Sequence, residues 1–153
     1  MRNRAGAPLE ERVFYRSKND ATLFSVRDAM EHVRATLKQR AVDDVTLSSI
    51  EIVVTEVLNN IVEHALIEGS GWFEFSCEIK KNELSFHIKD NGLEMPLGRL
   101  PEGIPPETHG PRCSLPEGGW GWSLVHTLAN DLRYQRNGSI NHVRFTISRI
   151  KPS

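Results

Sequence analysis

Glu56 and Asn60 place a carboxylate and a carboxamide one helical turn apart, in a segment whose apolar residues recur at helical spacing. With 100° per residue measured from Glu56, Asn60 falls at about 40° and Glu63 at about −20°. His64 falls at about 80°, at the edge of the apolar arc. The spacing therefore predicts that Glu56, Asn60 and Glu63 share one margin of a buried helix face.

These residue types could hold a metal ion and move a proton. Magnesium prefers oxygen ligands and keeps several waters, so one amide or carboxylate oxygen together with substrate phosphates can hold it. A second carboxylate one turn away could take a proton from an attacking hydroxyl. Taken alone, the same cluster also fits a solvated helix face with a histidine at its boundary.

Two glycine-containing turns could complete a nucleotide site. In Asp90-Asn91-Gly92 the carboxylate could accept a hydrogen bond from an exocyclic amine such as that of adenine, and Gly92 would let the backbone pass close to the ring. Gly118-Gly119-Trp120-Gly121 precedes a short apolar helix and could offer backbone N–H groups to phosphate. Singly, these segments also fit a hairpin turn and a flexible turn. The glycine spacing matches neither a Walker loop nor a Rossmann fingerprint.

The elements that must position these residues follow from hydrophobic periodicity and cap residues. Asp20 is the predicted N-cap of the first helix, and Asp43 or Asp44 that of the second. Asn137-Gly138 is a hairpin signal. The periodicity predicts strands at 11–17, 71–80, 83–90, 132–137 and 140–149, and helices at about 21–40, 44–66 and 122–130.

This order predicts one α+β domain over residues 11–150, preceded by a flexible tail at 1–10. The fold class is a two-layer α/β sandwich, in which helices cover one face of a mixed, mainly antiparallel sheet. Residues 91–117 hold six of the eight prolines, so no regular element is expected there. An irregular segment of that length inside a domain is usually functional or disordered, and we interpret about 91–120 as a lid.

The composition excludes several function classes. The chain has 153 residues and a formal net charge of −1, so its charge gives no reason to expect a nucleic acid or an anionic membrane as partner. The sequence has no apolar run of about 18 residues, so no membrane span is predicted. Cys77 and Cys113 fit a reduced cytoplasmic protein, although a single disulfide stays open. Two cysteines do not make a structural zinc site.

Three motifs in order resemble those of the GHKL (Bergerat) ATPases, which include gyrase and histidine kinases. Residues 56–65 resemble the N box, Asp90-Asn91-Gly92 the first glycine box and residues 119–125 the second. The His64-Ala65 ending, the proline-rich lid and residues 131–138 resemble the stand-alone branch of anti-sigma-factor serine-protein kinases. The resemblance covers about residues 11–149.

The resemblance implies ATP and Mg²⁺ as cofactors and a role for each site residue. Asn60 is similar to the magnesium ligand, and Glu56 to the carboxylate that activates the attacking serine hydroxyl. Asp90 is similar to the acid that reads adenine, Gly92 to the glycine under the base, and His64 would lie near the nucleotide.

In the second glycine box, Gly119 and Gly121 resemble the lid glycines that wrap the phosphates. Gly118 replaces an arginine that is common in the family, and Trp120 and Trp122 replace leucines. The missing cation weakens the expected phosphate clamp. Three basic side chains could compensate: Lys89, His109 and Arg112.

The function implied is an anti-sigma factor that phosphorylates a serine on a STAS-type anti-anti-sigma partner and sequesters a sigma factor, as a cytoplasmic homodimer. The alternative is a non-catalytic binding module in which nucleotide only tunes partner affinity. A third candidate, the catalytic domain of a sensor histidine kinase, rests on His32 as phosphoacceptor. The usual proline after that histidine is absent, and a helix of about 20 residues is too short for the paired helices of such a dimer.

Overall fold

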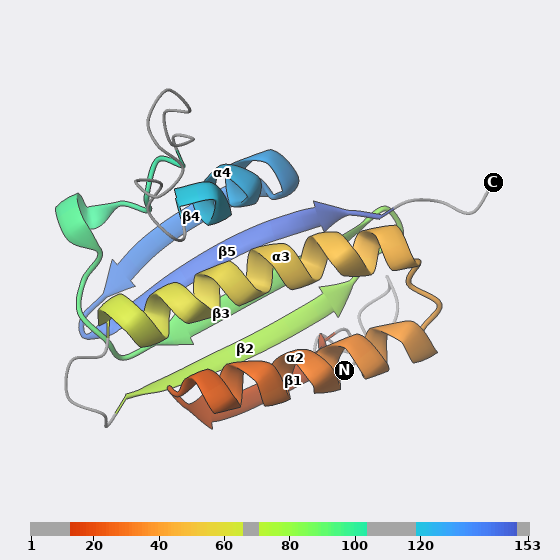
Figure 1. Ribbon diagram of the computed structural model, residues 1–153, viewed down its shortest axis with the longest axis horizontal. Coiled ribbons are helices and arrows are strands. Elements are labelled where there is room, and N and C mark those ends of the chain that lie inside the picture. The colour runs from red at the N-terminus through yellow and green to blue at the C-terminus, as the bar shows by residue number, and fades with distance from the viewer. Residues whose placement is uncertain (1–12, 66–70, 104–118, 150–153) are drawn as a thin grey trace, which may run out of the picture.

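One five-stranded sheet carries three α-helices on a single face (Figure 1). The computed structural model describes residues 13–65, 71–103 and 119–149. The order of elements in these residues is β1 (Val13–Asp20), α2 (Leu23–Gln39), α3 (Asp44–Asn60), the π-helical turn η1 (Ile61–Ala65), β2 (Trp72–Ile79), β3 (Glu83–Asp90), the 3₁₀ turn η2 (Pro96–Gly98), α4 (Gly119–Leu128), β4 (Asn130–Asn137) and β5 (Ile140–Ser148).

The strands run in the spatial order β1-β2-β3-β5-β4. All four pairings of the described strands are antiparallel, so no parallel pair contributes to the mixed sheet that the sequence suggested. Gly138, with φ of 59°, turns the chain between β4 and β5 as the Asn-Gly signal predicts. β3 and β5 are thereby central neighbours, although 49 residues separate the end of β3 from the start of β5.

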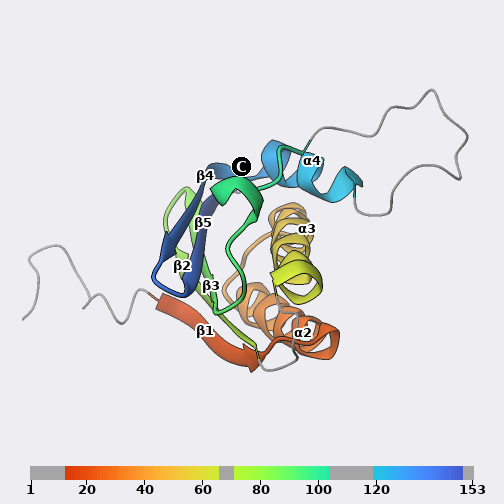
Figure 2. The same cartoon turned by 90° about the vertical axis from the view of Figure 1, so that its left-hand side faces the viewer.

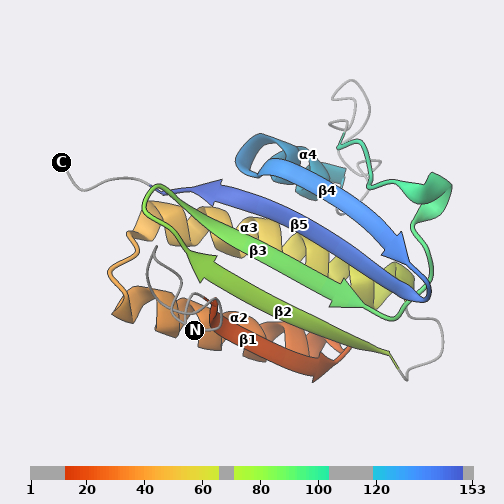
Figure 3. The same cartoon turned by 180° about the vertical axis from the view of Figure 1, so that it is seen from behind.

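The two layers are visible end-on in Figure 2, with the sheet on one side and the helices on the other. Alternation along each strand sends every second side chain toward the helices. Phe75, Phe86 and Phe145 form a row of stacked rings across β2, β3 and β5, with centroid separations of 5.9 and 5.1 Å. The face seen in Figure 3 carries no helix among the described elements. The α+β two-layer fold class is confirmed.

Side-chain caps fix where α2 and α3 begin. The Thr22 hydroxyl accepts a hydrogen bond from Ser25 N at 3.0 Å, so α2 starts after Thr22 and not after Asp20 as predicted. Asp20 is still part of β1, where it pairs with Trp72. α3 begins after Asp43, which is one of the two predicted caps.

α3 is the central helix of the core. Residues Asp44–Glu63 are long and apolar enough to cross a membrane by length and composition alone. No such span was predicted from the sequence. Its apolar side chains instead form a stripe that is buried against the sheet: Leu47, Ile50, Val53, Val54, Val57 and Leu58. This burial accounts for the composition without a membrane.

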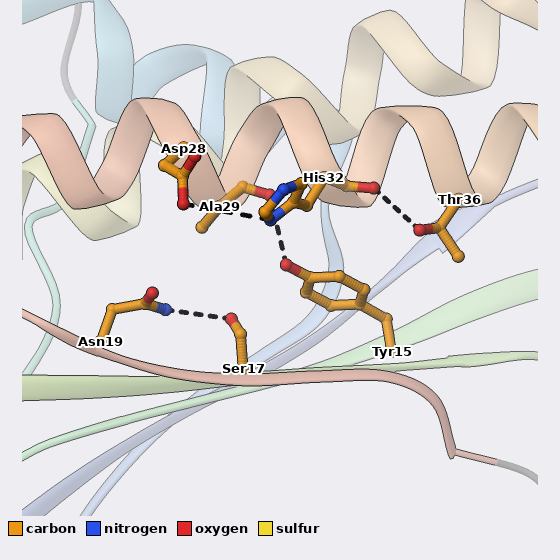
Figure 4. Close-up of polar contacts among 7 residues, drawn as sticks. All are labelled: Tyr15, Ser17, Asn19, Asp28, Ala29, His32 and Thr36. Carbon is orange, nitrogen blue, oxygen red and sulfur yellow. Dashed lines mark hydrogen bonds and ion pairs between the residues drawn. The ribbon is translucent and has the colours of Figure 1, made fainter.

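α2 packs beside β1 and carries His32 on its outer surface (Figure 4). The Tyr15 hydroxyl donates to the Ala29 carbonyl at 3.5 Å, which ties β1 to this helix. His32 is 67% exposed and lies 3.9 Å from the Asp28 carboxylate. An exposed histidine on a 17-residue helix that packs in this domain gives no support to the histidine-kinase hypothesis.

Three local features differ from the predicted elements. α3 ends at Asn60 and continues as the π-helical turn η1, where the sequence suggested an uninterrupted helix. η2 interrupts the segment in which no regular element was expected. α4 begins at Gly119, three residues earlier than predicted, so Gly119 and Gly121 both lie in its first turn. Cys77 is a free, buried thiol, and Cys113 lies outside the described residues.

The Asp43 cap generates the first prediction. The Thr46 hydroxyl (2.6 Å) and backbone N–H (2.9 Å) donate to the Asp43 carboxylate, and these bonds lower its pKa. Asp43→Ala should destabilise the protein by about 1 kcal/mol at pH 7 in urea unfolding. Because the folded pKa is depressed, this contribution is present above the unfolded pKa of about 3.9 and is lost as the pH falls through the folded value.

Asp44→Ala is the matched control, because Asp44 lies in the first turn and does not cap the helix. We expect a loss of only a few tenths of a kcal/mol for this change. Equal losses for the two variants at pH 7 would contradict the capping role.

Candidate functional site

Asp90 ends β3 with its carboxylate buried on the helix side of the sheet. It is 2% exposed and directly faces Asn141 of β5 in the strand register. Its Oδ1 accepts hydrogen bonds from Gly92 N at 2.8 Å and from Asn141 Nδ2 at 2.9 Å. Its Oδ2 accepts none from the described residues. That oxygen is free to accept a hydrogen bond from a ligand.

Burial raises the pKa of Asp90, and the hydrogen bonds from Asn141 and Gly92 act in the opposite direction. A ligand amine that donated to Oδ2 would add a further bond to the ionised form. The site therefore favours a ligand with a hydrogen-bond donor at this point.

Asn141 is the centre of a buried polar network that the sequence interpretation missed. Its Nδ2 donates to Asp90 and also to the Leu93 carbonyl at 2.8 Å. Its Oδ1 accepts from the Tyr134 hydroxyl at 2.6 Å and from Arg136 at 3.0 Å. A signal was present, because Asn141 occupies an inward position in a strand whose other inward residues are apolar.

The same network fixes the chain that leaves β3. Arg136 donates to the Gly92 carbonyl at 2.8 Å, and Met95 N donates to the Tyr134 hydroxyl at 3.0 Å. Residues 92–95 are thereby held against β4. The glycine that was predicted to lie under the base is buried, and both its N–H and its carbonyl are already bonded.

Two adjoining cavities meet at Asn60. The first is narrow, about 10 Å³, and is lined by Val57, Asn60, Ile61, Asp90, Met95, Leu100, Trp122, Tyr134, Asn141 and Val143. The second has a volume of about 800 Å³ and is lined by Asn60 and residues 93–103, apart from Gly98. Met95 and Leu100 line both cavities. The structure thus brings Asn60 and Asp90, which are 30 residues apart in sequence, to one cavity.

Glu56 lies against the first turn of α4. A Cβ built on Gly121 would overlap the Glu56 carboxylate, so the two residues are in close contact and a larger residue at position 121 would require that carboxylate to move. Burial and the nearby charge of Glu63 raise the pKa of Glu56. The contact places the predicted base beside one of the two predicted lid glycines.

The π-helical turn changes how the end of the N box is presented. A helical wheel assumes α geometry through Glu63 and His64, whereas the chain widens from Ile61 onward. Glu63 is still close enough to influence the pKa of Glu56. The side chain of His64 lies outside the described residues, so its predicted place near the nucleotide stays a prediction.

The structure also separates the candidate cations. Lys89 points to the opposite face of the sheet, where it lies 3.7 Å from Glu74, so it does not compensate for the missing lid arginine. His109 and Arg112 lie outside the described residues. Arg99 lines the large cavity with Asn60, and the sequence interpretation did not select it.

The structure thus brings a buried acid and a carboxamide to one cavity, and it places a partly buried glutamate beside a helical glycine. The sequence profile of the histidine kinase-like ATPase domain matches residues 20–147. The chain belongs to this family. The resemblance to the GHKL ATPases is therefore confirmed, and the site described above occupies the family's domain.

Named relatives in the same group are serine-protein kinases. The serine-protein kinase RsbW of Bacillus thuringiensis (strain Al Hakam) is 31% identical over 94 residues, which are 61% of this chain and 58% of that protein. RsbW of Bacillus cereus (strain 03BB102) matches with the same identity and coverage. The matches thus span 58% of the length of these curated relatives.

A solved structure shares the fold. The crystal structure of the RsbU and RsbW domains of Rv1364c from Mycobacterium tuberculosis matches with a TM-score of 0.63 and 15% identity. The match covers 91% of this chain and 34% of that chain.

The contact between Gly121 and Glu56 can be tested through the pKa of Glu56. Gly121→Ala should leave the protein folded, because the end of the Glu56 side chain can swing away from the added methyl group. The carboxylate would then move toward solvent, and the pKa of Glu56 should fall toward the ordinary value of about 4.3. Titration of the side-chain carboxyl carbon by NMR measures this shift.

Ser123→Ala, two residues further along α4, is the control and should leave the Glu56 titration unchanged. A folded Gly121→Ala protein with the native pKa for Glu56 would show that the two groups do not touch.

The role of Asn141 can be tested by urea unfolding. Asn141→Ala leaves a buried carboxylate with one fewer donor and should destabilise the protein by about 1–3 kcal/mol at pH 7. The variant raises the pKa of Asp90 further, so the loss should shrink as the pH falls and Asp90 becomes protonated in both proteins.

Asn137→Ala, at the exposed end of β4, is the control and should change the free energy of unfolding by less than about 0.5 kcal/mol. An equal loss for Asn141→Ala at every pH would argue that the residue does not support the ionised Asp90.

Proposed function

We propose that this protein binds ATP with Mg²⁺ and transfers the terminal phosphoryl group to a serine of a STAS-type anti-anti-sigma partner, and that it sequesters a sigma factor. The observation that carries the proposal is the narrow cavity shared by Asp90 and Asn60. It joins an acid with a free acceptor oxygen to an amide oxygen suited to magnesium, in a chain of the histidine kinase-like ATPase family.

In this proposal Asp90 accepts a hydrogen bond from the adenine amine through Oδ2. Gly92 lies beneath the base, and its position is fixed by bonds at both its N–H and its carbonyl. The rigidity of this floor supports recognition, because the network of Asn141 holds the acid and the following chain in one arrangement.

Asn60 would supply one oxygen to the magnesium ion. Among the residues that the structure describes, no group of three or more His, Cys, Asp or Glu side chains could hold a metal. A protein that offers one amide oxygen suits magnesium, which is bound mainly by nucleotide phosphates and water. The metal would therefore arrive with the nucleotide rather than reside in the free protein.

Glu56 would act as the general base. Its carboxylate takes the proton of the serine hydroxyl as the serine oxygen forms its bond to the γ-phosphorus, and the bond from that phosphorus to the bridging oxygen breaks to release ADP. Burial and Glu63 raise the pKa of Glu56, which makes its carboxylate a stronger base than an exposed glutamate. Its contact with Gly121 supports this role, because it places the base beside the helix turn proposed for the phosphates.

Gly119 and Gly121 would present backbone N–H groups to the phosphates from the first turn of α4. Arg99 could add a cation from the side of the large cavity, since its present ion pair with Glu102 is exposed and long, at 3.5 Å. His64 is proposed to lie near the nucleotide as the resemblance implies.

The partners and the cellular setting are inferred from the relatives. The RsbW proteins that match are named serine-protein kinases, and the match covers 58% of their length. We infer a serine-bearing protein substrate from that name, and the sigma factor, the STAS-type partner, the homodimer and the cytoplasmic location from the family resemblance.

A second function, nucleotide-tuned binding without catalysis, is favoured by the sequence, because Gly118 replaces the arginine common in the family and leaves a weaker phosphate clamp. Either function requires the narrow cavity to open, because a volume of about 10 Å³ does not admit a purine unless side chains that line it are displaced. Calorimetry with ATP and magnesium tests for nucleotide binding, which the kinase and the binding module both require. Phosphoryl transfer then separates the kinase from the binding module.

The decisive experiment uses a partner isolated by pull-down with and without Mg-ATP, then incubated with γ-labelled Mg-ATP. The native protein should label a serine of that partner. Glu56→Gln keeps the shape of the side chain but cannot accept the proton, so transfer should fall by about 10²- to 10⁴-fold while the Kd for Mg-ATP changes little.

Glu51→Gln is the matched control on the same helix, because the Glu51 carboxylate pairs with Arg34 at the surface and does not line the cavity. Transfer should be unchanged in this variant. Normal labelling by Glu56→Gln would remove Glu56 from the mechanism, and ATP binding without labelling in the native protein would favour the binding module.

A further inference from the structure

The indole of Trp122 is buried without a hydrogen-bond acceptor. The residue is 6% exposed, and its Nε1 has no partner within the described part of the chain. An indole N–H is a donor only, and a donor shielded from water and left unpaired is unfavourable to the fold. Native proteins leave few such groups, and they are found where a ligand or a function requires them.

The location of Trp122 shows which ligand could satisfy this donor. Trp122 lines the narrow cavity together with Asp90 and Asn60. The other buried polar atom without a partner in the described residues, the Thr146 hydroxyl, belongs to the opposite face of the sheet and lines a different hollow. The unpaired indole thus lies at the very site where Asp90 has a free acceptor oxygen.

Trp122 is held firmly in this place. His126, one turn later in α4, shares a hydrogen bond of 2.7 Å with the Pro101 carbonyl, and its ring lies 6.3 Å from the indole. Gly103, with φ of 70°, packs directly on the Trp122 backbone, where a Cβ would lie 2.5 Å from the carbonyl oxygen. A fixed indole can act as a directional donor, whereas a loosely packed one would only fill space.

We propose that Trp122 Nε1 donates a hydrogen bond to an acceptor atom in the nucleoside half of the bound nucleotide, a base nitrogen or a sugar oxygen. The inference rests on the proposed function, since it takes ATP as the ligand. Asp90 would accept from the base and Trp122 would donate to the same half of the molecule, so the two contacts together require a ligand with a donor and an acceptor. The phosphates would lie outside this contact, at the backbone N–H groups of Gly119 and Gly121 and beside the large cavity.

The test measures the Kd of adenosine, Mg-ADP and Mg-ATP by calorimetry. Trp122→Phe removes the N–H and should weaken the binding of all three ligands by a similar factor, between roughly 2- and 13-fold. Trp72→Phe is the control, because Trp72 starts β2 beneath the Lys18 ammonium group and lines neither cavity. Its affinities should match those of the native protein.

An isosteric replacement keeps the proposal testable if the smaller phenyl ring disturbs the fold. In a Trp72→Phe, Trp120→Phe background, Trp122 is exchanged for 3-benzothienylalanine, in which sulfur replaces the N–H and the bicyclic shape is retained. The protein with 3-benzothienylalanine at position 122 is compared with the double variant that keeps Trp122. A similar loss of affinity for adenosine, Mg-ADP and Mg-ATP in the benzothienyl protein supports the proposal.

Two results would overturn the inference alone. Unchanged affinities in the benzothienyl protein would show that the indole only fills space, while ATP binding and the proposed function would stand. A loss confined to Mg-ADP and Mg-ATP, with adenosine unaffected, would place the acceptor on a phosphate and contradict the assignment. If the native protein bound none of the three ligands, the proposed function itself would fail, and the inference with it.

Discussion

The hydrogen bond between Asn141 and Asp90 is the constraint on which the site depends. It joins β3 to β5 at a register position that faces the helices, where a carboxylate would otherwise be buried with a single donor. The remaining bonds of Asn141 hold the chain beyond β3, through Leu93, and the side chains of β4, through Tyr134 and Arg136. A buried acid, the floor of the cavity and the edge of the sheet are therefore one polar unit.

The helices on the sheet supply further residues of the site. The apolar stripe of α3 faces the sheet and leaves Glu56 and Asn60 at its margin, where α4 closes against them. Because Gly121 lacks a side chain, the backbone of α4 can approach the Glu56 carboxylate closely. The helix that supplies the buried stripe of the core therefore also carries the acid that contacts the first turn of α4.

The sequence predicted most elements, because periodicity and cap residues are local signals, and it selected Asn60 and Asp90, which the structure brings to one cavity. It did not predict the cap at Thr22, since whether Asp20 belongs to a strand or a helix depends on pairing with Trp72 across the sheet. The π-helical turn after Asn60 was missed because a helical wheel assumes α geometry throughout the helix. Asn141 was missed because its role comes from the register of β3 with β5, which no motif records.

The polar groups around the narrow cavity imply a ligand that the closed arrangement excludes. Within the described residues, one oxygen of Asp90 and the indole N–H of Trp122 have no hydrogen-bond partner, yet the cavity that both residues line has a volume of only about 10 Å³. Entry of a ligand must therefore displace side chains that line this cavity, which include Met95, whose backbone N–H donates to Tyr134. The apparent affinity for a nucleotide is then the intrinsic affinity reduced by the fraction of open molecules. A partner that held residues 93–103 away from the cavity would strengthen nucleotide binding without touching the nucleotide, and nucleotide would strengthen that partner's binding by the same factor.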